Sequence, residues 1–225
     1  MVTPLKQGQL LPPKSPNLLI APVEYTQTYQ DQLNNALRLY FNQLDNFGYS
    51  LSTGVGGSSL SFPCIAAYYF PDQYASADNT ATLVLWNGSS RINGFTLNAD
   101  NTATAQQSGT YKITYSLQLA NSDNAAHDAI VWLRVNNIDV PFSTTIFTVP
   151  ARKSAGVYTY VCGYSEVVFD LNAGDKVALY WGTDQHATSG GALGIWIYSR
   201  AAQTVPMAYP ATPSAIGSIT FISSL

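Results

Sequence analysis

The chain has 225 residues and a formal net charge of −3, and only 10% of its residues are charged, against a usual share of about 25%. It has no run of basic residues, which argues against the cationic surface that nucleic-acid binding needs. No apolar run approaches the roughly 20 residues of a membrane-spanning helix, and prolines interrupt the first residues, MVTPLKQGQLLPPKSP, where a secretory signal would be apolar. We therefore expect a protein made in a cytoplasm that binds neither nucleic acid nor a membrane.

Residues 1–23 are predicted to form an extended arm. Proline disfavours helix at the residue before it, and the arm contains Pro4, Pro12, Pro13, Pro16 and Pro22. The arm also carries apolar residues where a disordered linker would be more polar, namely Leu10, Leu11, Leu18, Leu19, Ile20 and Val23. We expect the arm to lie in a groove on another protein; a mobile tail with a few stray leucines is the alternative.

Residues 24–46, EYTQTYQDQLNNALRLYFNQLDN, are predicted to form one amphipathic helix. Its apolar stripe recurs at helical spacing in Leu33, Leu37, Tyr40 and Leu44, and Gly48 is placed to end the helix. Residues 47–61 are rich in glycine and serine and are predicted to be a flexible linker. The stripe needs a partner, which could be the chain's own sheet, copies of the helix or another protein. The sequence leaves these three open.

Residues 62–225 are predicted to form an antiparallel β-domain. In YKITYSLQL (111–119) apolar and polar residues alternate without a break, which is typical of a strand with one buried face. Strands are expected near residues 81–86, 92–97, 101–105, 110–120, 129–136, 138–145, 157–162, 165–171, 176–182, 193–200 and 216–223. Turn sequences such as Asn136-Asn137 separate them. Many short strands with such turns indicate a sandwich, a jelly roll or a barrel.

The chain shows no arrangement of residues that suits catalysis or a cofactor. The motifs GxSxG, HExxH and CxxC are absent from the sequence. Asp170, Asn172 and Asp175 together are too few oxygen ligands for calcium. His127 and His186 each lie near an aspartate in a polar segment and are expected to be solvated loop side chains. We therefore predict a protein without enzymatic activity and without a cofactor or metal.

Three segments of the β-domain carry a resemblance: SGTYKITYSLQLAN, IVWLRVNNIDVPFSTT and VVFDLNAGDKVALYW. In this order they resemble the tumour-necrosis-factor/C1q-like jelly roll, in the form found in bacteriophage structural proteins. The matching residues are Gly109, Tyr111, 132–136, Val140, Pro141, Ser143, Leu171, 173–175 and Trp181. The family usually has Asn-Gly where this chain has Asn136-Asn137, and asparagine also tolerates positive φ. The resemblance covers about half of the chain and implies a trimer with an aromatic inner face.

The front of the chain resembles an amino-terminal module of phage virion proteins, notably those of phages of aquatic bacteria. The resemblance rests on PPKSPNLLIAPVEYTQTYQDQLNNALRLYFNQLDN (12–46). In that family the module precedes varied carboxy-terminal domains, which implies an attachment device. The candidate anchoring residues are Leu18, Leu19, Ile20, Tyr25, Tyr29, Leu33, Leu37, Tyr40, Phe41 and Leu44. Packing inside the protein is the other interpretation of these residues.

Together the resemblances imply a non-enzymatic structural protein of a phage virion. It would be a homotrimeric capsid decoration or cement protein, or a head fibre, whose residues 1–46 bind the major capsid protein or another virion protein. The alternative is a tail or tail-fibre component whose jelly-roll tip binds a host-surface glycan through loops 121–128 and 183–191. The sequence has more aromatic residues than one small core needs. The candidates for core or trimer interface are Tyr111, Tyr115, Trp132, Phe169, Trp181 and Trp196. Cys64 and Cys162 are expected to be free thiols.

Overall fold

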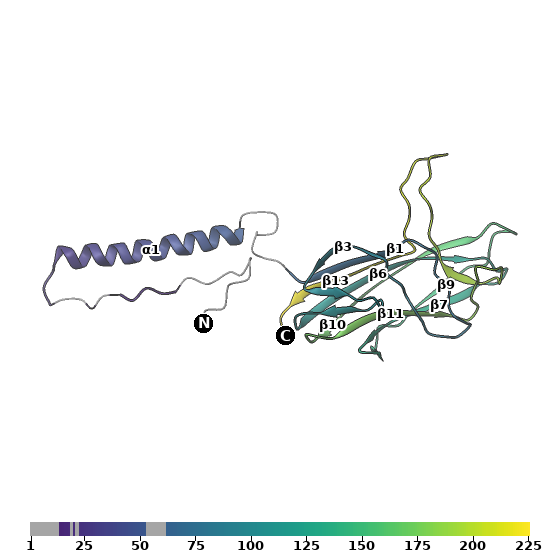
Figure 1. The fold of residues 1–225 in the computed structure, drawn as a ribbon, viewed down its shortest axis with the longest axis horizontal. Helices are drawn as coiled ribbons and strands as arrows, with labels where there is room; N and C mark the ends of the chain where they lie inside the picture. The colour runs from purple at the N-terminus through teal and green to yellow at the C-terminus, as the bar shows by residue number, and fades with distance from the viewer. Residues whose placement is uncertain (1–13, 19, 21–22, 53–61) are drawn as a thin grey trace. The chain divides into compact units, whose positions relative to one another are not determined.

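The computed structural model describes residues 14–18, 20, 23–52 and 62–225. The chain separates into two compact units, Met1–Ser61 and Phe62–Leu225 (Figure 1). We refer to them as the N-terminal unit and the β-domain. Residues 14–18 and 20 have no regular secondary structure, in keeping with the prolines around them.

The N-terminal unit contains the helix α1 (Gln27–Ser52). Thr26 caps its start, because its side-chain oxygen accepts a hydrogen bond from the backbone N–H of Tyr29 at 3.4 Å. The predicted helix is confirmed, but the prediction that it ends at Gly48 is wrong. In the sequence the apolar spacing continues through Phe47 and Leu51, and a glycine inside a helix costs only about 1 kcal/mol. Residues 47–52 are therefore helix rather than linker, and residues 53–61 lie outside the described part.

The β-domain consists of two antiparallel sheets that pack face to face (Figure 1). Sheet A has the order β10 (Thr159–Leu171), β6 (Gly109–Asn121), β13 (Ala215–Ser223), β1 (Cys64–Tyr69) and β3 (Gly88–Asn93), with β12 (Ile195–Ile197) also paired to β6. Sheet B has the order β4 (Phe95–Leu97), β5 (Ala103–Ala105), β11 (Lys176–Thr183), β7 (His127–Val135) and β8 (Ile138–Asp139), with β2 (Thr82–Leu83) on β11 and β9 (Thr145–Val149) on β7. The predicted mainly-β class, a two-sheet antiparallel fold preceded by one helix, is confirmed.

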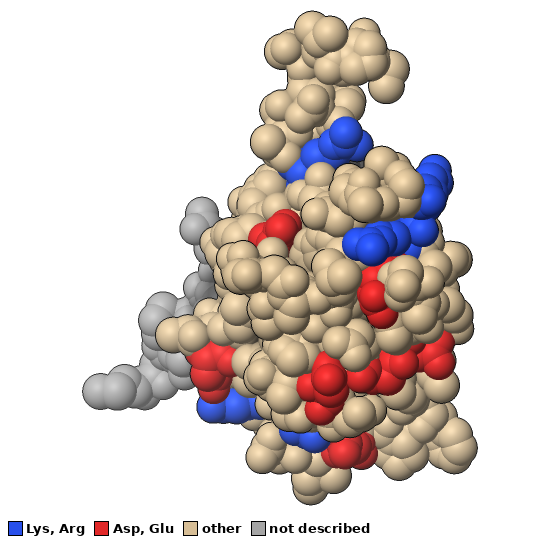
Figure 2. All heavy atoms as spheres, turned by 90° about the vertical axis from the view of Figure 1, so that its right-hand side faces the viewer, with Lys and Arg blue, Asp and Glu red and all other residues tan. Residues whose placement is uncertain are grey.

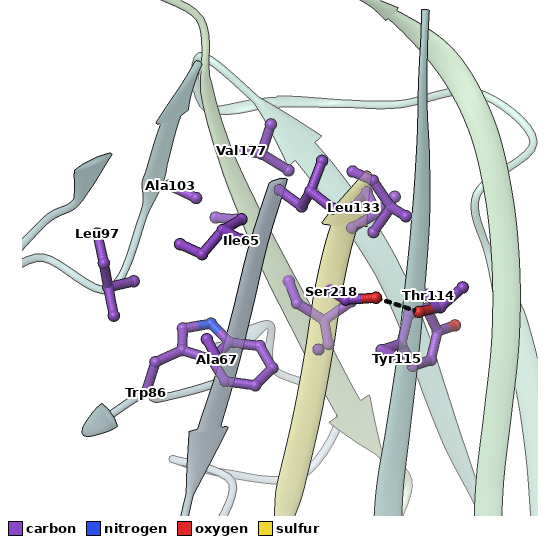
Figure 3. A pocket seen from close by; sticks show the side chains of 15 residues that line it. Ile65, Ala67, Trp86, Leu97, Ala103, Thr114, Tyr115, Leu133, Val177 and Ser218 are labelled. Carbon is purple, nitrogen blue, oxygen red and sulfur yellow. Dashed lines mark hydrogen bonds between the residues drawn. The ribbon is translucent and has the colours of Figure 1, made fainter. Parts of the chain in front are cut away.

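The core lies between the sheets and follows the alternation seen in the sequence. On β6, Tyr111, Ile113, Tyr115, Leu117 and Leu119 are all buried, and the residues between them are half-buried on the outer face. The sheets leave a cavity of about 50 Å³ between them, lined mainly by apolar side chains (Figure 3). That volume is far below the roughly 300–1,000 Å³ of ligand pockets, so the core is not a ligand site.

Four strand predictions are wrong. Strand β3 (Gly88–Asn93) was missed except for its last two residues, which fall in the predicted strand 92–97. Strand β1, CIAAYY, was missed, because it lacks the polar residues that mark an alternating strand. The predicted strand at 138–145 is instead the short β8, a turn and the start of β9. The predicted strands 157–162 and 165–171 are one strand, β10, with Gly163 inside it. A Cβ atom at Gly163 would lie 3.0 Å from Cδ2 of Phe147, so the glycine makes room for that ring rather than ending the strand.

The β-domain has two distinct ends. We call the end at which β1 begins the proximal end. The antiparallel strand β13 finishes there, because Cys64, the first residue of β1, pairs with Thr220 near the end of β13. The β7–β8 turn is also there; Asn136 and Asn137 have φ of 51° and 66°, which confirms the predicted hairpin. The distal end carries the loops 122–126, 150–158 and 184–194, because β6 finishes and β7 and β10 begin there. The chain between β12 and β13 folds into a hairpin, 200–212, that stands out from the sandwich in Figure 1.

Candidate functional site

The outer surface of sheet A is a candidate interface. We define the sheet A face by the outward side chains Tyr160, Cys162, Tyr164 and Val168 of β10, Ile216 and Ile222 of β13, and Tyr68 of β1. The strand register places Tyr164, Ser116, Ile216 and Tyr68 in one row across four strands. Tyr164 is 58% exposed and Ile216 is 47% exposed.

The sheet A face is neutral over most of its area. Lys112 and Glu166 form an ion pair at 3.5 Å and thus compensate each other. The other outward residues of β6 are uncharged, namely Thr110, Thr114, Ser116 and Gln118. Exposed tyrosine and isoleucine on a neutral surface are typical of protein–protein interfaces. Both cysteines are free, as predicted, and both lie on sheet A.

The structure places the predicted aromatic candidates mostly in the core. Tyr111, Tyr115 and Trp181 are buried between the sheets, and Trp196 is buried in a second, smaller cluster. Phe169 is half-buried and packs against the main core, and Trp132 is half-buried. The tyrosines that β10 does expose, Tyr160 and Tyr164, have the opposite parity to Phe169 and Leu171. Along a strand, odd-numbered and even-numbered residues point to opposite faces, and this separates core residues from surface residues. The rule applies to Tyr160 and Tyr164 only because residues 159–171 form one uninterrupted strand.

Trp132 has a local role on the outer face of sheet B. Its ring stacks on Tyr180 with centroids 6.1 Å apart, and its Nε1 donates a hydrogen bond to Asp139 at 2.7 Å. The guanidinium of Arg134 lies 4.1 Å from the centroid of the Tyr180 ring and donates to the same carboxylate at 2.6 Å. These hydrogen bonds from Arg134 and Trp132 lower the pKa of Asp139. The partners of Trp132 are thus within its own sheet.

The candidate anchoring residues divide into two groups. Leu18, Ile20, Tyr25 and Phe41 are exposed, and Ile20 is 95% exposed. The half-buried group is Tyr29, Leu33, Leu37, Tyr40 and Leu44, the stripe predicted for the helix. Leu19 lies outside the described residues. The exposed group can contact another molecule without any rearrangement of the described residues.

At the distal end His127 joins two aspartates from separate loops. Its Nε2 lies 2.8 Å from Asp123 and its Nδ1 lies 3.0 Å from Asp184. A neutral imidazole can donate from only one nitrogen, so both hydrogen bonds require the charged ring. The side chain of His127 is 12% exposed. The expectation of a solvated loop histidine is therefore wrong for His127, because β7 begins at this residue and holds the ring between the loops.

The aspartates change the pKa values at this end. Burial by itself lowers the pKa of His127, but the hydrogen bonds to Asp123 and Asp184 outweigh it and raise the pKa above the usual value. The pKa of Asp123 is lowered, first by its hydrogen bond with His127. His186 has a similar partner, Asp78, which accepts hydrogen bonds from its Nδ1 at 2.6 Å and its backbone N–H at 2.7 Å. Figure 2 looks onto this end of the β-domain, where acidic side chains form a band.

We expect the stability of the β-domain to fall as the pH rises through the folded-state pKa of His127. A raised histidine pKa contributes stability that is fully present below the usual value of about 6.5 and is lost above the folded value. The lowered pKa of Asp123 acts in the other direction, and its contribution is lost as the pH falls below about 4. Urea unfolding across this range checks the expectation. His127→Gln, which cannot titrate, should abolish the alkaline decline; an unchanged profile would contradict the assignment.

A hollow of about 230 Å³ also opens at the distal end. We call it the distal hollow, and its walls include Tyr74, Ser122, Tyr158, Thr188, Ser189 and Trp196. The sequence predicted a binding face in loops 121–128 and 183–191, and Ser122, Thr188 and Ser189 belong to them. The aromatic walls come from three other segments: Tyr158 precedes β10, Trp196 lies in β12 and Tyr74 follows β1. The sequence alone did not predict that these segments meet the loops.

The chain matches no protein-family model and no curated protein. Within the part of the chain that the structure describes, no helix is long and apolar enough to cross a membrane. Among the same residues, no cluster of histidine, cysteine, aspartate or glutamate side chains could hold a metal ion.

Proposed function

We propose that this chain is a non-enzymatic structural protein of a bacteriophage virion, a homotrimer that decorates the capsid or forms a head fibre. The observation that carries the proposal is the division of the chain into two units with different surfaces. The N-terminal unit exposes apolar side chains, and the β-domain exposes a neutral, tyrosine-rich sheet. Such surfaces suit attachment to a larger assembly and self-association, respectively.

The strand order supports the resemblance to jelly rolls of the tumour-necrosis-factor/C1q-like family. From β6 onward, the connections β6–β7, β9–β10, β10–β11 and β11–β12 cross from one sheet to the other, whereas β7 and β9 lie in the same sheet, as do β1 and β3. Crossing connections are typical of Greek-key sandwiches and jelly rolls. In this proposal the sheet A face is the trimer interface, because it exposes Tyr160 and Tyr164 together with Ile216 and carries few charges, of which Lys112 and Glu166 form an ion pair.

The second candidate function is a tail or tail-fibre component that binds a host-surface glycan. The observation that favours it is the distal hollow, which lies at the end of the β-domain opposite to Cys64, where the chain enters. A trimer anchored through its N-terminal unit could present this end to the outside. The number of copies per particle separates the two functions: hundreds indicate a capsid protein, and a few to a few dozen indicate the tail.

We expect attachment to particles to depend on the exposed residues of the N-terminal unit. The double variant Ile20→Asp, Tyr25→Asp should reduce the copies per purified particle at least about tenfold, because burying an unpaired carboxylate costs several kcal/mol. Quantitative mass spectrometry of particles is the measurement. Gln32→Asp, at an exposed position of α1, is the matched control and should leave the copy number unchanged. Full occupancy by the double variant would contradict anchoring, and absence of the wild-type chain from particles would overturn the proposed function.

A further inference from the structure

We propose that the distal hollow binds a single residue of an uncharged sugar. The hollow is open to solvent at the distal end and has a volume of about 230 Å³, just below the roughly 300–1,000 Å³ of pockets for drug-sized ligands. It therefore suits one pyranose ring rather than an oligosaccharide. The inference uses the second candidate function only for the origin of the sugar, and binding itself can be tested on the isolated protein.

Aromatic rings form the apolar part of the hollow together with Ala187, Ala192 and Leu193. Tyr158 and Trp196 meet edge to face, with ring centroids 5.2 Å apart and an interplanar angle of 87°. Tyr198 also meets Trp196 edge to face, with ring centroids 6.1 Å apart. These contacts hold the rings in place before a ligand arrives, which lowers the entropy cost of binding. A sugar ring has faces of C–H groups that pack against such aromatic surfaces, while its hydroxyls need polar partners.

The loop 187–194 supplies those polar partners. The Thr188 hydroxyl accepts the backbone N–H of Ala192 at 3.0 Å, which leaves its own proton free to be donated. The hydroxyls of Ser189 and Tyr158 have no hydrogen-bond partner among the described residues. Trp196 is only 6% exposed, and its Nε1 is buried without an acceptor in the described part of the chain. Because that nitrogen is out of contact with solvent, the polar partners open to a ligand are the hydroxyls of Thr188, Ser189 and Tyr158.

The absence of charge in the hollow selects the class of sugar. None of the residues that line it is aspartate, glutamate, lysine, arginine or histidine. Acidic side chains form a band on the same end of the domain (Figure 2). Asp123 and Asp184 are both paired with the charged ring of His127, and Arg152 donates a hydrogen bond to the backbone carbonyl of Ser122 at 3.1 Å, so the selection rests on the uncharged lining of the hollow itself. A sialic or uronic acid would bring a carboxylate with no cation in the hollow to pair with. A neutral hexose, deoxyhexose or N-acetylhexosamine has only hydroxyl and amide groups to satisfy.

The test is saturation-transfer NMR on the full-length chain. The probes are methyl glycosides of glucose, galactose, mannose, rhamnose and N-acetylglucosamine, with N-acetylneuraminic acid as the charged comparison. We expect at least one neutral glycoside to bind with a dissociation constant in the millimolar range or tighter, and the charged sugar to give no signal. Failure of all the neutral glycosides at millimolar concentration, or binding of the charged sugar alone, would overturn the inference.

Variants locate the binding on the protein. Tyr158→Ala removes one aromatic wall and should weaken binding at least about tenfold, which corresponds to about 1.4 kcal/mol. Ser189→Ala, at an exposed position that does not support the fold, should weaken binding about threefold to fivefold. Phe142→Ala is the matched control, because Phe142 is fully exposed in the loop after β8 and should not matter. Unchanged binding in both Tyr158→Ala and Ser189→Ala would place the sugar elsewhere and reject the inference.

The sugar-binding experiment and the particle experiment can fail independently of each other. A chain that is found on particles but binds no neutral sugar would reject the distal hollow as a sugar site and keep the structural role. A chain that binds the sugar but is absent from particles would reject the virion assignment and keep the site.

Discussion

Replacing Tyr164 and Ile216 together by aspartate is expected to convert the proposed trimer into monomers. Both side chains are exposed on the sheet A face, in the same row of the sheet, so neither substitution disturbs the core of the β-domain. In a trimer that buries this face, each protomer would bury two unpaired carboxylates at a cost of several kcal/mol. We expect the association constant to fall at least about a hundredfold, which corresponds to about 2.8 kcal/mol.

Sedimentation equilibrium or light scattering on the purified chain measures this effect. Ile146→Asp is the matched control, because Ile146 is an exposed isoleucine of β9 in sheet B, outside the sheet A face. It should leave three chains together. A wild-type chain that is monomeric at micromolar concentration would contradict the trimer, and dissociation caused equally by Ile146→Asp would place the interface on the other sheet.

Trp181→Ala is expected to lower the free energy of unfolding of the β-domain by about 3–5 kcal/mol. Trp181 is fully buried in β11, where it pairs with Val131 of β7 and Thr82 of β2. Removing the ring leaves a cavity that neighbouring side chains in a two-sheet core can fill only in part. The Nε1 of Trp181 has no hydrogen-bond partner in the described residues, so Trp181→Phe should cost much less.

Urea unfolding at a fixed protein concentration is the measurement, because association would otherwise shift the midpoint. Trp132→Ala is the control of the same residue type. Its ring is half-buried on the outer face of sheet B and bonds Asp139, so we expect a loss of only about 1 kcal/mol. Equal losses for Trp181→Ala and Trp132→Ala would contradict the assignment of Trp181 to the core.

Local patterns in the sequence determined several elements of this protein. The alternation from Tyr111 to Leu119 predicts both the strand β6 and its buried face, because a strand side chain can point only to one side or the other. The pair Asn136-Asn137 predicts the β7–β8 hairpin, because asparagine accepts positive φ. The apolar spacing of residues 33–44 predicts the helix. Each of these depends on residues a few positions apart.

The candidate functional surfaces, by contrast, depended on contacts between residues that are distant in the sequence. His127 is held by Asp123, four positions away, and by Asp184, which is 57 positions away. Asp123 alone does not require a charged ring; the second hydrogen bond does, and it depends on the tertiary structure. Tyr158 and Trp196 meet only because β10 and β12 both pair with β6 at the distal end. The exposure of Tyr164 became clear only when 159–171 proved to be one strand, since a glycine can interrupt a strand or make room for a neighbour's ring. Which of these occurs at Gly163 is decided by Phe147, on another strand, and therefore by the tertiary structure.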